Sequence, residues 1–505
     1  MNDPSGGLAT LRERLPTPRM VAIALLASVA GIAGSYAIAG FTPSFIVGPI
    51  AGAMARQLPA QVITFAILVL GDVGDQLNIV TALGISMLLL AAASLAGLLL
   101  GDRFDAPPVG ILVGAAGGIA IAFVVTAAPL ASVVTGVAMG VVIAVGELSV
   151  RGGEVGGISE ERRSVLGGVA SAIGLSIGGF VLGSRGGVTG SSGSVALDVE
   201  PSVASEIDSL LSEADAKSLN VPGLEPLVSE SFYEVDINAT DPNLDTADWE
   251  LSVTGAVDES VSYSYEDVRE MGAENRFVSL RCVGESLNGK KLDNALWTGI
   301  PIMDVVDPAG PAEECCVMLR AADGFYEEFP LSALSDGFLA YGMNGDVLPR
   351  GHGYPVRALI PGHWGEINVK WITEIEVLEE EVDGYWEERG WHGTGPVETV
   401  AKLHLIDHLD DGRIRVGGHA FAGTRGIDQV ELSTDGGESW TDVTRSEPLP
   451  GADVRRQWSH VYDSPGSEHE VVVRATDGTG TLQPEDETDA FPSGPTGWVS
   501  KIVQP

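Results

Sequence analysis

Cysteine is scarce in this chain of 505 residues, which contains only Cys282 and the adjacent pair Cys315 and Cys316. Three thiols make neither a disulfide framework nor a CxxC cluster, and an iron–sulfur cluster would need about four thiolates. Histidine is absent before His352, so a bis-histidine haem cannot form in the N-terminal part of the chain. We therefore expect no haem and no iron–sulfur cluster in this chain.

Positive charge is also scarce. The chain has 29 lysine and arginine residues against 69 acidic residues, which gives a formal net charge of −40. Residues 1–183 hold 8 arginines, no lysine and 10 acidic residues, so nearly all of the net negative charge lies after residue 183. Phosphate binding needs a basic surface, which excludes nucleic acid as a partner. An acidic surface of this density stays hydrated in concentrated salt, and it predicts a halophilic, archaeal source.

Long apolar runs fill the first third of the chain. Five of them lack lysine and arginine, and most approach or exceed the ~20 residues that cross a bilayer. They are Met20–Phe41, Leu77–Leu100, Val109–Ala127, Leu130–Gly146 and Val165–Gly183. A shorter run, Val62–Leu70, predicts an interfacial or re-entrant helix over Leu58–Gly71. We expect residues 1–183 to form a membrane domain of five transmembrane helices and one interfacial helix.

The arginines between these runs predict the orientation of the helices. Five spans place all of them on the cytoplasmic side, and the chain after residue 184 then lies outside the cell. These arginines are Arg12, Arg14, Arg19, Arg103, Arg151, Arg162 and Arg163. Arg162-Arg163, before an apolar stretch, also resembles a twin-arginine export signal, and two positive-inside anchors explain the pair equally well. We expect a multi-pass cell-membrane protein whose remaining domains are extracellular.

Three further regions follow the apolar runs. Residues 184–231, rich in glycine and serine and then in acidic residues, predict a flexible acidic linker. Strand-like patterns and Gly/Pro turns over 232–385 predict an α+β domain. Short alternating strands over 386–505, with the hairpin signal Asp435-Gly436-Gly437, predict an immunoglobulin-like β-sandwich.

The stretch Arg276–Trp297 contains the most informative cysteine. Its apolar run Phe277–Leu280 predicts a strand that delivers Cys282 into a segment rich in glycine, serine and asparagine. A thiolate held at the end of a strand suits a metal ligand or a nucleophile. Taken alone, Cys282 fits a buried structural cysteine as well. The segments that accompany it in the sequence decide between a structural and a functional role.

Five segments, in this order, together resemble the molybdopterin domain of the sulfite oxidase family. They are Ser231–Asp236, Leu280–Gly284 followed by Trp297–Pro301, Asp323–Tyr326, Leu339–Gly365 and Asn368–Trp371. The first is similar to the bacterial methionine sulfoxide reductase branch. The resemblance implies a molybdopterin oxidoreductase that holds one molybdenum and one pyranopterin dithiolene.

The resemblance also implies roles for individual residues. Cys282 would be catalytic and would give the molybdenum its one protein thiolate. Tyr326 would be a catalytic residue that orients or protonates the oxygen in transit. Cofactor binding would fall on Tyr233, Glu234 and Asp323.

A pterin that carries a phosphate needs buried cations and fixed hydrogen-bond donors. Arg357, which precedes an apolar strand-like run, offers a rigid fork, and Lys370 offers a point charge. His352 lies in a Gly-His-Gly turn that a ligand can approach closely. Asn368, Val369 and the local backbone are expected to add contacts to the cofactor.

These observations predict a membrane-anchored molybdenum oxidoreductase that moves an oxygen atom to or from an S- or N-oxide or a related small substrate. The segment after Cys282 carries Glu285 and no arginine, which argues against an anionic substrate. Sulfite dehydrogenase is the alternative within this class, and a non-catalytic cell-surface binding protein is the alternative of another class. Expected partners are the lipid bilayer, an external haem, copper or quinone-linked redox protein, and a second copy through the C-terminal domain.

Overall fold

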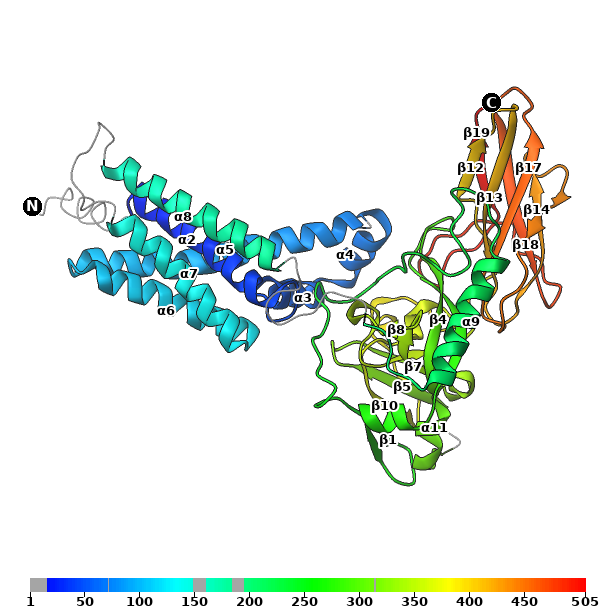
Figure 1. Cartoon of the computed structure of the whole chain (residues 1–505), viewed down its shortest axis with the longest axis horizontal. Coiled ribbons are helices and arrows are strands. Elements are labelled where there is room, and N and C mark those ends of the chain that lie inside the picture. Colours follow the sequence, from blue (N-terminus) through cyan, green and yellow to red (C-terminus); the bar gives the residue numbers. More distant parts are fainter. Residues whose placement is uncertain (1–15, 71, 149–159, 184–194, 313–314) are drawn as a thin grey trace, which may run out of the picture. The chain divides into compact units, whose positions relative to one another are not determined.

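A computed structural model describes residues 16–70, 72–148, 160–183, 195–312 and 315–505 (Figure 1). The described residues divide into two compact units. The first contains the apolar helices together with residues 236–243. The second contains the strands, and residues 59–71 belong to it.

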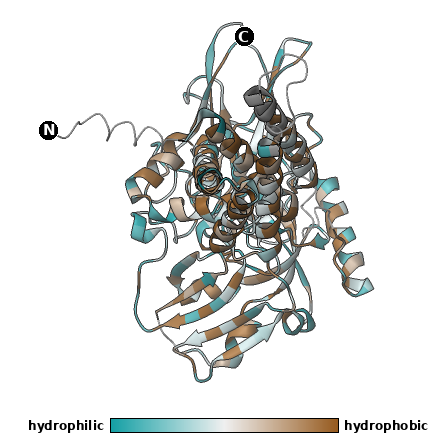
Figure 2. Cartoon of the chain, turned by 90° about the vertical axis from the view of Figure 1, so that its left-hand side faces the viewer, coloured by the Kyte–Doolittle hydropathy of each residue, from teal (hydrophilic) through white to brown (hydrophobic). Residues whose placement is uncertain are grey.

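Apolar helices form the first unit, and Figure 2 shows their hydrophobic colouring. Their bounds are α2 (Pro18–Ala39), α3 (Val47–Gln57), α5 (Asp72–Arg103), α6 (Pro107–Thr126), α7 (Pro129–Leu148) and α8 (Glu160–Gly183). By length and composition, α2, α5, α6 and α7 each hold a segment able to cross a membrane. Within the described ranges the count becomes five if α3 and residues 60–70 form one bent span. The apolar part described for α8 is the shorter Val169–Gly183, so five separate spans stay a prediction.

Glycine allows two of these helices to approach closely. A methyl group on Gly97 of α5 would lie 2.5 Å from the carbonyl oxygen of Gly110 and 2.6 Å from the backbone nitrogen of Gly114, both in α6. Small residues that let helix backbones touch are typical of helix pairs in membranes. The side chains of Arg162 and Arg163 lie outside the described residues, as do Arg12, Arg14 and Arg151.

Two sheets form the first part of the second unit. One has the order β2-β1-β10-β5-β6, and the other has the order β3-β4-β7-β8 with β9 paired to β7. The first sheet consists of β1 (Glu250–Gly255), β2 (Val261–Ser264), β5 (Cys316–Ala321), β6 (Tyr326–Pro330) and β10 (Ile372–Leu378). The second consists of β3 (Glu274–Arg281), β4 (Leu292–Pro301), β7 (Phe338–Met343), β8 (Asp346–Val347) and β9 (Arg357–Leu359). With the short helices α10 (Tyr265–Glu270) and α11 (Met303–Val306), they form the sheet-rich domain that the sequence predicts.

Two antiparallel sheets follow and share one buried core. The first consists of β11 (Val400–Ala401), β12 (Leu405–His408), β13 (Arg413–Phe421), β16 (Thr444–Arg445) and β17 (Arg456–Asp463). The second consists of β14 (Ile427–Ser433), β15 (Thr441–Asp442), β18 (His469–Asp477) and β19 (Val499–Val503). The predicted hairpin is confirmed, because β14 and β15 pair and the φ angles of Gly436 and Gly437 between them are +74° and +96°. The immunoglobulin-like topology itself stays a prediction.

The structure differs from the predicted flexible linker over 184–231. Within that range lies the 17-residue helix α9 (Pro201–Lys217), whose Ile207 and Ala214 are buried in a core with Phe277 and Leu296 of β3 and β4. Its apolar residues have the helical spacing i, i+3, i+4 and i+7, which the acidic composition obscured. They are Ile207, Leu210, Leu211 and Ala214. Residues 184–194, where four of the five glycines of this range lie, are outside the described residues.

The segment expected to be interfacial folds as α4 (Ala60–Phe65) and the π-helical turn η1 (Ala66–Leu70). Ile67 packs against the apolar core that includes Trp391. Other large apolar side chains of the segment are exposed, Phe65 at 53% and Val69 at 64%. An interfacial location therefore stays a prediction that these exposed side chains favour.

Candidate active site

Cys282 directly follows β3, as the sequence predicts. Its backbone N–H donates to the carbonyl oxygen of Lys291 at 3.0 Å, which fixes the residue beside the start of β4. It is the free thiol of the described chain, because Cys315 and Cys316 are joined in a disulfide. Burial raises the pKa of the Cys282 thiol, and the nearby charge of Lys291 opposes this. A metal ion bound to the sulfur would therefore be needed to keep Cys282 as a thiolate at neutral pH.

Gly284 leaves a narrow space beside the sulfur. A methyl group at this position would lie 3.2 Å from Ile67 Cγ2, 3.6 Å from the Trp391 ring and 4.0 Å from Cys282 Sγ. The indole Nε1–H of Trp391 is buried and has no acceptor among the described residues. Sequence reasoning missed both Ile67 and Trp391. The signal for Trp391 was the pair of nearby glycines in Gly390-Trp391-His392-Gly393.

Glu285 does not present a free negative charge in the Cys282 loop. Arg281 Nε donates to Glu285 Oε1 at 3.0 Å, and Lys402 Nζ donates to the same oxygen. Burial raises the pKa of Glu285, but the two cations outweigh it and the net shift is downward. The remaining guanidinium donors of Arg281 bind the backbone oxygens of Glu398 and Pro495. The charges of this buried cluster therefore compensate one another, and the cluster holds the Cys282 loop in place.

Tyr233 connects the thiol to the predicted cofactor residues. Burial raises its pKa well above the ordinary value, the charges of Cys282 and Glu285 add to this, and Arg357 opposes it. Its hydroxyl would lie 2.8 Å from a methyl group on Gly365, so only glycine fits there without displacement. Tyr233 therefore lies within electrostatic reach of both Cys282 and Arg357.

Arg357 is buried at the start of β9. Its guanidinium donates to the backbone oxygens of His352 and Asn368, each at 3.0 Å, and stacks over Trp297 with its central carbon 5.1 Å from the ring centre. Burial lowers the pKa of His352 to about 3, and the charges of Arg357 and Lys370 contribute. These two cations therefore create a positive region around a neutral imidazole.

Lys370 and Glu234 lie in the same region. Lys370 Nζ donates to the carbonyl oxygen of Gly351 at 2.9 Å, in the turn that carries His352. Glu234 Oε1 lies 3.7 Å from His352 Nε2. The structure thus brings together Tyr233, Glu234, His352, Arg357 and Lys370.

Asn368 and Val369 have internal roles. The amide oxygen of Asn368 accepts the N–H of Ile360 at 2.7 Å, and its amide nitrogen donates to the carbonyl oxygen of Trp364 at 2.9 Å. Val369 is buried in the core, and its backbone carbonyl accepts the N–H of Ala358 at 2.8 Å. These residues position the segment between Arg357 and Lys370, and they offer a ligand little beyond backbone contact.

Tyr326 and Asp323 lie at the start of β6 and in the turn before it. Tyr326 begins β6, and the contacts found for it in the described chain join it to Tyr385, Arg320 and Glu388. Asp323 caps the preceding turn by accepting the N–H of Phe325 at 2.9 Å. The roles of Tyr326 and Asp323 at the site therefore stay predictions.

These observations fit a molybdenum pyranopterin. The loop that follows β3 offers one soft sulfur ligand beside a glycine. The positive region at Arg357 and Lys370 suits a phosphate, since it already suppresses protonation of His352. Glycines at 284, 353 and 365 keep these backbones free of side chains that would collide with the residues around them.

Comparison with known proteins agrees with this arrangement. Residues 238–386 match the family model of the oxidoreductase molybdopterin binding domain, and residues 397–492 match that of the Mo-co oxidoreductase dimerisation domain. The chain belongs to the sulfite oxidase family. It is therefore a molybdopterin-dependent enzyme, and the non-catalytic alternative is wrong.

Individual relatives within the sulfite oxidase family are distant. Mitochondrial sulfite oxidase of Mus musculus is 27% identical over 298 residues, which cover 48% of this chain and 55% of the mouse protein. Sulfite oxidase of Arabidopsis thaliana is 25% identical over 303 residues, covering 47% of this chain and 77% of the plant protein. The uncharacterized oxidoreductase YuiH of Bacillus subtilis is 32% identical over 154 residues, which cover 30% of this chain and 76% of the Bacillus protein. The chain thus spans about half the length of the mouse enzyme.

A solved structure is also similar. The sulfane dehydrogenase SoxCD from Paracoccus pantotrophus matches with a TM-score of 0.48 and 20% identity, covering 58% of this chain and 90% of the other.

Proposed function

We propose that this sulfite oxidase family member is a membrane-anchored oxidoreductase that transfers an oxygen atom to or from a neutral S- or N-oxide. The charges around Cys282 carry the proposal. Two carboxylates, Glu285 and Glu366, and one ammonium, Lys291, act on the thiol. The fully buried guanidinium of Arg281 is directed to Glu285 and to backbone oxygens. The guanidinium of this loop is therefore held by the protein itself and is not directed to a substrate, which favours a neutral substrate over a small anion.

Each residue of the site would have a separate role in binding the cofactor or the substrate. Cys282 would hold the metal. Arg357 and Lys370 would bind the phosphate-bearing end of the pterin and would hold the backbone segments around His352 and Asn368 in place. The bound cofactor would supply the two-electron exchange of an oxygen atom. Tyr233, between these groups, would exclude water from the interior of the site. Trp391, with its buried indole N–H beside the Cys282 loop, would donate a hydrogen bond to the substrate oxygen.

The reaction in the reducing direction consumes two electrons and two protons and releases the deoxygenated substrate and water. The electrons would come from an external haem, copper or quinone-linked protein. A homodimer through residues 397–492 follows from the dimerisation-type domain. Five spans, for four of which α2, α5, α6 and α7 are long and apolar enough, would anchor the enzyme in the cell membrane with the catalytic unit outside.

Sulfite dehydrogenase is the second candidate, because the mouse and plant relatives are named sulfite oxidases. Two dye assays on the purified full chain separate the candidates. Methionine sulfoxide or dimethyl sulfoxide should oxidise a reduced viologen, whereas sulfite should not reduce ferricyanide. Sulfite-dependent reduction, with no activity on either sulfoxide or on trimethylamine N-oxide, would replace this proposal with the second candidate.

Protease accessibility tests the orientation. In sealed right-side-out vesicles, externally added protease should cleave exposed loops of the strand-rich unit, and the apolar helices should remain protected. Cleavage only after the vesicles are opened would place the catalytic unit inside the cell.

A further inference from the structure

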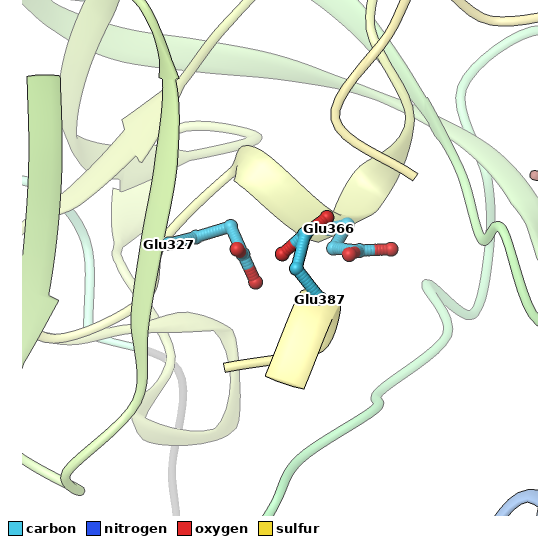
Figure 3. A group of neighbouring side chains, drawn as sticks. All are labelled: Glu327, Glu366 and Glu387. Carbon is cyan, nitrogen blue, oxygen red and sulfur yellow. The ribbon is translucent and has the colours of Figure 1, made fainter. Parts of the chain in front are cut away.

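Three glutamate side chains from separate elements meet inside the catalytic unit. Glu327 lies on β6, Glu366 lies in the 3-10 turn η5 (Gly365–Ile367), and Glu387 begins the 3-10 turn η6 (Glu387–Arg389). One carboxylate oxygen of each lies within 4.8 Å of the other two. The three side chains extend toward one another (Figure 3).

The structure leaves these carboxylates without compensating groups. Glu366 is only 9% exposed, and neither of its buried oxygens has a hydrogen-bond partner among the described residues. The oxygens of Glu387 are likewise buried without a hydrogen-bond donor. Glu327 is fully buried and accepts two long bonds, from the backbone N–H groups of Glu328 and Trp386, each at 3.4 Å. Burial and the neighbouring Glu387 carboxyl raise the pKa of Glu327 well above its ordinary value. No Lys, Arg or His in the described ranges forms an ion pair with any of the three.

Two glycines make room for the carboxylates. A methyl group on Gly384 would overlap Glu327 Oε1 and would lie 2.7 Å from Glu387 Oε2. A methyl group on Gly393 would overlap Glu366 Oε2. Neither glycine has a positive φ angle, so space and not backbone strain requires the absence of a side chain. The backbone at these two glycines thus approaches the carboxylates more closely than a residue with a side chain could.

Burying three carboxylates without a counter-charge is costly, because each ionised group loses several kcal/mol of hydration. Protons or a metal ion could supply the missing charge. The three oxygens lie within 4.8 Å of one another, which matches the about 4.6–5.2 Å between ligands on opposite sides of Ca²⁺. Mg²⁺, with about 4.0–4.2 Å between such ligands, would draw the side chains closer together. The cluster contains no sulfur or nitrogen ligand, which argues against zinc or copper.

We propose that Glu327, Glu366 and Glu387 form a binding site for one hard divalent cation, Ca²⁺ or Mg²⁺, that is separate from the molybdenum ligand Cys282. The ion would join β6, η5 and η6. Since η6 leads directly into Trp391, the ion would fix the segment that lines the space beside Gly284. The test of this site needs no substrate, so its outcome can be separated from that of the proposed function.

Calorimetric titration of the full-length protein tests the site without any measurement of turnover. The purified chain is treated with EDTA, dialysed, and titrated with Ca²⁺ and separately with Mg²⁺ in about 1 M NaCl, which screens the acidic surface. We expect one saturable ion per chain and a rise in the melting temperature that EDTA reverses. Glu366→Gln and Glu387→Gln should each weaken binding by at least about 10-fold, because a lost ligand should cost no less than a lost outer-shell partner.

Glu379→Gln is the matched control, because it removes the same charge from an exposed position near the end of β10. It should bind as the unmodified protein does. Absence of a saturable site at millimolar concentrations of both ions would overturn the proposal and leave protons as the compensating charge. Equal binding by all three variants would also overturn it, because the ions would then bind only the acidic surface.

Discussion

Arg281 Nε lies 3.0 Å from Glu285 Oε1, and the two side chains are 0% and 2% exposed. Lys402 binds the same carboxylate oxygen and is also fully buried. The carboxylate of Glu285, in the loop that carries Cys282, therefore compensates two buried cations. The loop position depends on this arrangement, because removal of the shared anion leaves two unpaired charges.

Glu285→Gln should lower the free energy of unfolding by about 3–5 kcal/mol, because Arg281 and Lys402 would lose their counter-charge. Burial already lowers the pKa of Lys402 to about 8, so the variant should favour its neutral form further. Denaturant unfolding followed by tryptophan fluorescence measures the change. Asp411→Asn, which breaks the exposed Arg413–Asp411 pair, is the control and should leave the unfolding midpoint nearly unchanged. A similar small effect for Glu285→Gln would show that the buried cluster is not structural.

Cys282→Ser should abolish turnover and leave the fold intact, because a hydroxyl is a much poorer ligand for the metal than a thiolate. Dye-linked activity and the melting temperature measure the two effects. Ser286→Ala, at an exposed position in the same loop, should keep its activity. Turnover retained by Cys282→Ser would remove this sulfur from the mechanism.

Arg357→Lys should reduce the molybdenum and pterin content of the purified protein. Lysine cannot reproduce both hydrogen bonds, to His352 and Asn368, nor the stacking on Trp297, and each lost charged bond is worth about 1.5–3 kcal/mol. Metal analysis and pterin fluorescence measure the content. Arg413→Lys, on an exposed strand end, should leave both values unchanged. Full cofactor loading in Arg357→Lys would contradict the role of this guanidinium.

Asp453→Asn should stabilise the protein at pH 8 and change little at pH 3, below both pKa values. Burial raises the pKa of Asp453 from 3.8 to about 7, and its Oδ1 has no hydrogen-bond partner among the described residues. A carboxyl group with a raised folded-state pKa loses stabilisation as pH rises between its unfolded and folded pKa values. The neutral amide removes this loss, and melting temperatures at the two pH values measure it. An equal shift at both pH values would indicate a packing effect instead of a charge effect.

The sequence by itself determined much of the site. The apolar run before Cys282 fixed a strand with the thiol at its end, and the order of the five segments identified the enzyme family. Arg357, Lys370 and His352 were found because their residue types and rigid neighbours match the needs of a phosphate-bearing ligand. The hairpin at Gly436 and Gly437 followed from local backbone preferences, which need no tertiary information.

Tertiary structure alone decided the rest. Helix α9 forms within an acidic segment because its Ile207 and Ala214 find a buried surface on β3 and β4. Asn368 turns inward because its amide satisfies the backbone of Ile360 and Trp364, a choice that depends on how distant segments fold together. Trp391, Ile67 and the three glutamates were missed for the same reason. Chain segments far apart in sequence meet only when the core packs, and no local pattern encodes that meeting.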